Sequence, residues 1–191
     1  MAKLKLGVIV GSNRKESINR KLGQVLAKLG SDSFDATFIQ IDDLPMYNQD
    51  LEQPVPAPVA RFKAAVEGSD ALLFVTPEHN RSITAVLKNA IDWGSRPWGK
   101  TSWPDKPAAI IGTSGSPIST AIAQQHLSAV LGNQGLSLLG GEAYILFKPD
   151  LFDADDNVTD ANVKPFLKAF IDRFARFAGK LAAVPAQRDA A

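Results

Sequence analysis

Residues 4–19 read LKLGVIVGSNRKESIN, an apolar run followed by a polar loop that begins with glycine. The run from Leu4 to Val10 is typical of a strand that is covered on both faces. Beyond the loop, the segment 17–29 repeats its apolar residues at helical spacing. A buried strand that leads directly into an amphipathic helix indicates a chain of alternating strands and helices. The apolar stripe of this helix comprises Ile18, Leu22, Val25, Leu26 and Leu29.

The same alternation continues along the chain. Apolar runs predict further strands at 36–41, 71–76, 108–111 and 143–146, and helical stripes occur at 59–66, 86–91, 122–131 and 163–181. Five strands and five helices in alternation predict an α/β fold, a three-layer sandwich with helices on both faces of a parallel sheet. Right-handed crossovers favour the flavodoxin-like strand order 2-1-3-4-5. We expect one domain over residues 1–184 and a frayed tail over 185–191.

Composition excludes several classes of function. The 191 residues include 21 Lys and Arg against 20 Asp and Glu, and the net charge of +1 argues against a nucleic-acid-binding protein. There is no cysteine, which excludes disulfides, thiol catalysis and iron–sulfur clusters, and two histidines argue against a His-rich metal site. No apolar run approaches the roughly 20 residues of a membrane span. With no signal-peptide pattern either, we expect a cytoplasmic protein without a membrane partner.

In open parallel sheets, ligands bind beyond the carboxyl ends of the strands, where the strand order reverses. The first loop (residues 11–19) follows the first strand and offers the donors Ser12, Arg14, Ser17 and Asn19 at a helix N-terminus. Such a combination suits a phosphate group. The loop lacks the Gly-Lys-Ser/Thr of a Walker motif, and Gly11 alone does not make a dinucleotide fingerprint. The alternative is a capped helix that follows a solvated basic turn.

Two more loops lie at the same predicted edge. The second loop (residues 76–84, TPEHNRSIT) carries polar groups that suit the edge of a flat heterocycle, and Thr84 is placed to cap the next helix. His79 is a possible general base, but a surface or ring-edge contact is the favoured interpretation. The third loop (residues 112–119, GTSGSPIS) has glycines that allow close backbone approach and amides that suit an anion. Taken alone, the third loop would be interpreted as a simple turn.

Together these segments resemble the NAD(P)H-dependent FMN reductases, a group that includes chromate and quinone reductases. The resemblance extends over about residues 4–180, and His79 stands where the family usually has tyrosine. Ser119, Thr120 and Ile122 stand where it commonly has two glycines and an arginine. The motifs are Gly11-Ser12-x-Arg14 with Ser17-x-Asn19, Leu44-Pro45-x-Tyr47-Asn48-x-Asp50, Pro77-Glu78-x-Asn80-x-Ser82, Leu87-Lys88-Asn89-Ala90-Ile91-Asp92-Trp93 and Gly112-x-Ser114.

The resemblance implies tightly bound FMN, NADPH or NADH as hydride donor, and a homodimer or homotetramer. A hydride would pass from the nicotinamide to FMN N5, and the electrons then to a quinone, chromate, an azo or nitro compound or free flavin, in a ping-pong cycle. The hydride step requires no side-chain acid or base, so we assign no catalytic side chain. The implied FMN contacts are Ser12, Arg14, Ser17, Ile18 and Asn19 at the phosphate, Pro77, Glu78, His79 and Asn80 along the ring, and Thr113, Ser114 and Gly115 near its pyrimidine side.

Fixed donors near N1 and O2 of reduced flavin would favour its reduction. The candidates are the amides of Ser114 and Gly115, with the N-terminus of the following helix behind them. Two alternatives to an enzyme remain open, a flavodoxin-like FMN electron carrier and a flavin-binding regulatory protein. Such carriers are usually strongly acidic, so the isoelectric point of 7.9 favours the enzyme.

Some residues have open roles at this stage. Arg81 and Arg96 are candidates for the 2′-phosphate of NADPH, although the preference between NADPH and NADH is undecided. The segment with Trp93, Trp98 and Trp103 is expected on the same rim as the flavin loops, as a pocket wall or a dimer surface. Trp98 or Trp103 would be the anchors of that dimer. His126 is interpreted as structural.

Overall fold

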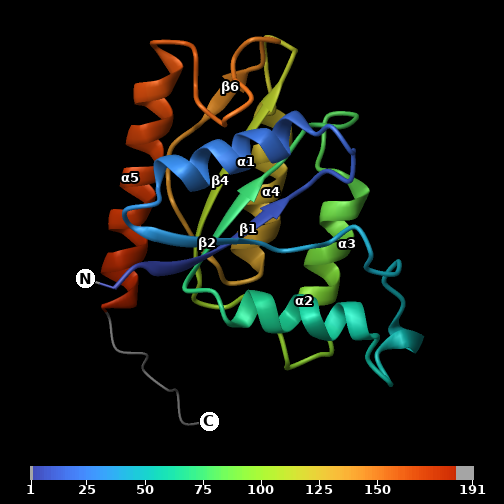
Figure 1. Cartoon of the computed structure of the whole chain (residues 1–191). Coiled ribbons are helices and arrows are strands. Elements are labelled where there is room, and N and C mark those ends of the chain that lie inside the picture. The colour runs from blue at the N-terminus through green and yellow to red at the C-terminus, as the bar shows by residue number, and fades with distance from the viewer. Residues whose placement is uncertain (1, 184–191) are drawn as a thin grey trace.

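A central parallel sheet organises the chain in the computed structural model, which describes residues 2–183 (Figure 1). The strand order is β2-β1-β3-β4-β5, with β6 also paired to β4, so the predicted flavodoxin-like order 2-1-3-4-5 is confirmed. The expected frayed tail, residues 185–191, lies outside the described residues. The strands are β1 Leu4–Val10, β2 Phe34–Phe38, β3 Ala71–Val75, β4 Pro107–Ser114, β5 Ser137–Leu138 and β6 Tyr144–Leu146. The helices are α1 Ile18–Leu29, η1 Gln49–Leu51, α2 Ala57–Glu67, α3 Ala85–Gly94, α4 Ala121–Asn133 and α5 Val163–Ala182.

Helices cover the sheet on both faces because alternate side chains of each central strand point to opposite sides. Leu6, Val8 and Val10 of β1 pack in one core cluster with α1 and α5. Ile9 belongs to the other cluster, which contains α2, α3 and α4. Strand β3 divides in the same way, which explains why both strands read as continuous apolar runs.

The predicted second strand, residues 36–41, is misplaced. The observed strand β2 begins at Phe34 and ends at Phe38. Its pairing with β1 ends where the N–H of Ile39 donates to the carbonyl of Val8 at 2.9 Å. Ile39 and Ile41 are buried, but they lie in a loop that packs in the α2–α3–α4 cluster. Their apolar character therefore reflects burial in that core rather than strand pairing.

Two short strands share the fifth position of the sheet. The predicted run 143–146 contains β6, which pairs with the end of β4 from Gly112 to Ser114. Strand β5, which the sequence analysis missed, pairs with the beginning of β4 at Pro107 and Ala108. The edge is therefore interrupted between the two strands. The local signal for β5 is a short apolar stretch between glycines, with leucine at positions 136, 138 and 139.

Candidate functional site

The first, second and third loops meet at the carboxyl edge of the sheet, next to the reversal of strand order between β1 and β3 (Figure 1). Thr84 caps α3 as predicted, because its Oγ1 accepts from the N–H of Leu87 at 3.3 Å. The same hydroxyl donates to the carbonyl of Gly11 at 2.8 Å and so joins the second loop to the first.

A cavity of about 210 Å³ opens between the three loops. It is lined by ten of the twelve residues that the sequence analysis assigned to FMN. His79 and Asn80 are the two that do not line it, and both are exposed. The lining residues are Ser12, Arg14, Ser17, Ile18, Asn19, Pro77, Glu78, Thr113, Ser114 and Gly115.

The first loop supplies an unusual number of free hydrogen-bond donors. Ser17 caps α1, with its Oγ accepting from the N–H of Arg20 at 3.2 Å. Within residues 2–183, the N–H groups of residues 12, 13 and 15–18 donate to no acceptor, and the guanidinium of Arg14 has no partner. A loop of unpaired donors at the positive end of a helix dipole suits a phosphate dianion. The residues present therefore fit the phosphate of FMN.

Asn19 joins the first loop to the third. Its side chain is 1% exposed, and its Nδ2 donates to the carbonyl of Thr113 at 2.9 Å. In return, the N–H of Thr113 donates to Oδ1 of Asn19 at 3.0 Å. Thr113 also donates from Oγ1 to the carbonyl of Ile145 at 2.8 Å, so its hydroxyl proton is not available to a ligand. Both residues line the cavity, and their polar groups are used to fix its walls.

Glu78 occupies the N-terminus of α4. Its Oε2 accepts from the N–H groups of Ile122 and Ala123 at 3.0 and 3.1 Å, and its Oε1 pairs with Arg81 at 3.0 Å. Only 8% of the Glu78 side chain is exposed. The carboxylate therefore neutralises the positive end of the α4 dipole. This helix end was expected behind the amides of Ser114 and Gly115, and two of its N–H groups are already paired with Glu78.

A tight hairpin places His79 and Asn80 beside the cavity rather than inside it. His79 and Ser82 exchange two backbone hydrogen bonds of 3.0 Å. The two residues between them are in the left-handed region, Asn80 at φ 49° and Arg81 at φ 61°, as the mirror-image turns of hairpins require. Ser82 Oγ lies 3.1 Å from Nδ1 of His126, so His126 connects this hairpin to α4. This contact agrees with the structural role expected for His126.

The third loop contains one glycine, Gly112, where a side chain would clash, and another, Gly115, where a side chain has room. A Cβ on Gly112 would lie 2.1 Å from the carbonyl oxygen of Thr76 and 2.5 Å from Oγ1 of Thr120. A Cβ on Gly115 would meet no atom within 4 Å. The N–H of Gly115 donates to no acceptor within residues 2–183, so it remains available to a ligand.

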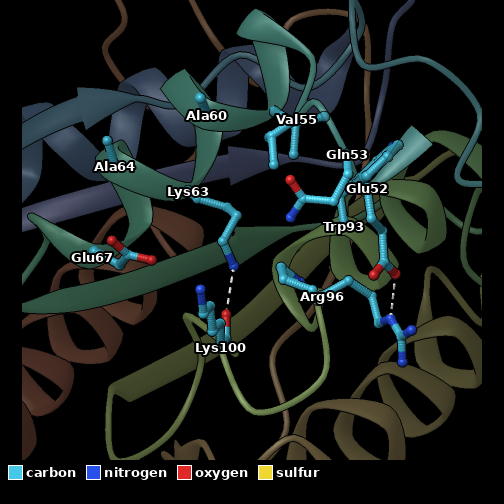
Figure 2. A pocket seen from close by; sticks show the side chains of 12 residues that line it. Glu52, Gln53, Val55, Ala60, Lys63, Ala64, Glu67, Trp93, Arg96 and Lys100 are labelled. Carbon is cyan, nitrogen blue, oxygen red and sulfur yellow. Dashed lines mark hydrogen bonds and ion pairs between the residues drawn. The ribbon is translucent and has the colours of Figure 1, made fainter. Parts of the chain in front are cut away.

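A second cavity, of about 370 Å³, lies between α2, the residues around η1 and the segment after α3 (Figure 2). At one side, Glu52 Oε1 accepts from Nε of Arg96 at 2.6 Å and from the hydroxyl of Tyr47 at 2.8 Å. Both donors lower the pKa of Glu52, and the guanidinium of Arg96 has the larger effect. At the other side, Lys63 Nζ donates to the carbonyl of Lys100 at 2.8 Å, and burial lowers the pKa of this lysine.

The tryptophans lie away from the flavin loops, contrary to expectation. Helix α3 runs back from the carboxyl edge, and the segment after it packs on α2, where Ser102 donates to Glu67 at 2.6 Å. Trp93 and Trp103 are buried core residues, so the expectation that Trp103 anchors a dimer is wrong. Trp98, in contrast, is 88% exposed. Trp93 belongs to α3 itself, and Trp103 packs against Phe62 of α2 and Phe74 of β3.

No helix of residues 2–183 is both long and apolar enough to cross a membrane. The same residues contain no group of three or more His, Asp or Glu side chains placed to bind a metal ion.

Comparison with known proteins gives a consistent result. The model of the NADPH-dependent FMN reductase family matches residues 4–148. The chain is 43% identical to a 2-hydroxy-1,4-benzoquinone reductase from a Burkholderia species, over 90% of this chain and 94% of that protein. It is 42% identical to a quinone reductase from Pseudomonas putida, over 89% and 92% of the two chains. The solved structure of the flavoenzyme NAD(P)H:(acceptor) oxidoreductase FerB from Paracoccus denitrificans superposes with a TM-score of 0.90 at 44% identity, covering 93% of this chain and 98% of that one.

Proposed function

The chain belongs to the family of NADPH-dependent FMN reductases, and from this membership we propose that it is an FMN-dependent NAD(P)H:quinone reductase. The observation that supports the proposal is the cavity of the three loops, where unpaired N–H groups and Arg14 offer donors that suit a phosphate. Overall, NAD(P)H, one proton and a quinone would give NAD(P)+ and a hydroquinone. FMN, when bound, supplies the hydride-accepting ring through which the two electrons pass.

The role of the protein residues is to bind FMN and to orient it. The N–H groups of the first loop and Arg14 would hold the phosphate of bound FMN, and the N–H of Gly115 would be available to donate to its ring. Glu78 positions the second loop through its bonds to α4. No side chain of the cavity is assigned as an acid or base, because hydride transfer requires none. Quinone as acceptor rests on the relatives, whose names include a benzoquinone reductase.

Two measurements test this proposal, the identity of the bound flavin and the kinetic order in which the two substrates react. The purified protein should be yellow, and heat should release FMN rather than FAD. The protein has one phosphate loop and no dinucleotide fingerprint, so it offers no site for the adenosine part of FAD. Initial rates at varied NAD(P)H and benzoquinone should give parallel double-reciprocal plots. A panel with chromate, an azo dye, a nitro compound and free FMN should rank quinone first. Recovery of FAD, or intersecting plots, would contradict the proposal.

An electron carrier without its own substrate is the remaining alternative for the same cavity. The family and the relatives are reductases, which favours an enzyme. The decisive comparison is turnover without any partner protein. An enzyme oxidises NADPH with benzoquinone alone, whereas a carrier needs an added reductase.

We further propose a homodimer or homotetramer in the cytoplasm. The association would use exposed apolar side chains on the two segments that line the second cavity, residues 46–55 and 96–100. Trp98 is 88% exposed and Met46 72% exposed, and Leu51 and Val55 are also exposed. The pair Arg96–Glu52 holds the two segments that carry these side chains together. Reduced nicotinamide nucleotides are cytoplasmic substrates, so the activity should follow a cytoplasmic marker in cell fractionation.

The Trp98→Ala variant should weaken this association. Central aromatic anchors contribute about 2 kcal/mol or more to an interface, which is roughly a 30-fold rise in the dimer dissociation constant. Analytical ultracentrifugation over a dilution series would measure it. Phe166→Ala, which removes an exposed aromatic ring from α5, is the matched control and should not change the constant. A wild-type protein that sediments at 20.5 kDa would refute the proposed oligomer.

A further inference from the structure

A groove of about 400 Å³ lies beside the flavin cavity, on the other side of the α1 N-terminus. The two cavities share Ser17 and Ile18 in their walls. The volume of the groove is within the range of roughly 300–1,000 Å³ that is common for small-molecule sites. None of the twelve residues assigned to FMN other than these two lines the groove, so it is a separate site that adjoins the first.

Two cations of this groove are free. Within residues 2–183, the side chains of Lys15 and Arg20 form no ion pair and no hydrogen bond. Lys21 also lines the groove, but it pairs with Asp156 at 2.5 Å. Glu16 is the only carboxylate among the lining side chains. The free cations therefore outnumber the free anions, which suits a phosphate ligand.

The opposite wall is aromatic. Phe147 and Phe152 line the groove together with Pro149, and both rings are partly buried. They belong to the segment between β6 and α5, which is held over α1 by Lys28, whose Nζ donates to the carbonyl of Asp155 at 2.8 Å. Aromatic faces next to cations suit a flat heterocycle that carries phosphate, such as an adenine nucleotide.

The arginines that the sequence analysis considered for the 2′-phosphate are already paired. Arg81 is bound to Glu78 at 3.0 Å, and Arg96 to Glu52 at 2.6 Å in the second cavity. NAD(P)H has one nucleotide more than FMN. Its adenosine end therefore needs a site beyond the flavin cavity, and the groove adjoins that cavity at Ser17 and Ile18.

We propose that this groove binds the adenosine end of NADPH, with the 2′-phosphate on Arg20 and Lys15 and the adenine against Phe147 and Phe152. The proposal rests on the function proposed above. It makes the enzyme selective for NADPH over NADH, because NADH has no 2′-phosphate to pair with these two cations.

Calorimetric titration of the FMN-loaded protein tests the site without turnover. Adenosine 2′,5′-bisphosphate should bind, and 5′-AMP should bind at least tenfold more weakly. Arg20→Ala should weaken binding of the bisphosphate by about tenfold or more, as expected for a lost hydrogen bond to a charged group. The affinity for 5′-AMP should stay unchanged. Lys15→Ala, in an exposed loop, should act in the same direction. Arg176→Ala removes the same charge from an exposed position on α5 and should have no effect.

Steady-state kinetics give the second measurement. In Arg20→Ala, the KM for NADPH should rise about tenfold, while the KM for NADH, the kcat and the FMN content stay at wild-type values. If the bisphosphate fails to bind, or binds Arg20→Ala as tightly as wild type, the groove is not the nucleotide site, even if the protein reduces quinones. A wild-type protein that binds no FMN, or that does not oxidise NADPH, would instead refute the proposed function.

Discussion

The Gly112→Ala variant is expected to lose about 3 kcal/mol of unfolding free energy and to lose FMN binding with it. The new Cβ would lie 2.1 Å from the carbonyl oxygen of Thr76, which belongs to the backbone and cannot rotate away. The third loop must therefore move away from the second, and the cavity between them opens. Urea unfolding followed by circular dichroism measures the loss of stability, and flavin fluorescence measures binding.

Gly115→Ala is the matched control for stability. It adds the same methyl group three residues later, where no atom lies within 4 Å. Its unfolding free energy should stay within about 0.5 kcal/mol of wild type, as for surface substitutions in general. Equal stabilities of Gly112→Ala and Gly115→Ala would mean that the loop adapts freely, and that Gly112 is not required by packing.

The Arg14→Ala variant is expected to bind FMN about 10- to 150-fold more weakly than wild type, the range for a lost hydrogen bond to a charged group. The guanidinium has no partner within residues 2–183, so its removal breaks no contact described there and acts on the ligand. Riboflavin lacks the phosphate and should bind both proteins equally. Fluorescence titration of the apoprotein with each flavin gives the four constants.

Arg61→Ala is a suitable control for this measurement. It removes an exposed arginine that pairs with Asp43; neither residue lines the cavity, and FMN affinity should not change. If Arg14→Ala weakened riboflavin as much as FMN, Arg14 would be a structural residue. The assignment of the first loop to the phosphate would then be wrong.

The order of the sheet could be predicted from the sequence because its central strands are buried on both faces. Ala71–Val75 is apolar throughout, and Leu4–Val10 is apolar apart from Lys5 and Gly7, so the polar loops after them stand out by contrast. The loops could be assigned to one site because parallel strands bring their carboxyl ends together. The resemblance to the FMN reductases assigned twelve residues in these loops to the flavin, and ten of them line one cavity.

What could not be predicted depends on contacts between distant residues. Glu78 reaches the N–H groups of α4 across 44 positions of sequence, and nothing local to Glu78 indicates that helix as its partner. The burial of Trp93 and Trp103 depends on α2, which packs from a separate part of the chain. One local feature of the sequence indicated the hairpin at His79–Ser82. Asn80 is a residue type that tolerates the left-handed conformation that this turn requires.

The interrupted edge of the sheet has a consequence for the behaviour of the protein at high concentration. A long, flat edge strand offers unpaired N–H and C=O groups to the edges of other molecules and so promotes aggregation. Here the edge beside β4 consists of a strand of two residues and a strand of three, with Gly141 at φ 95° between them. No continuous row of backbone groups is presented on that side. The break in β5 and β6 therefore protects the folded protein against edge-to-edge self-association.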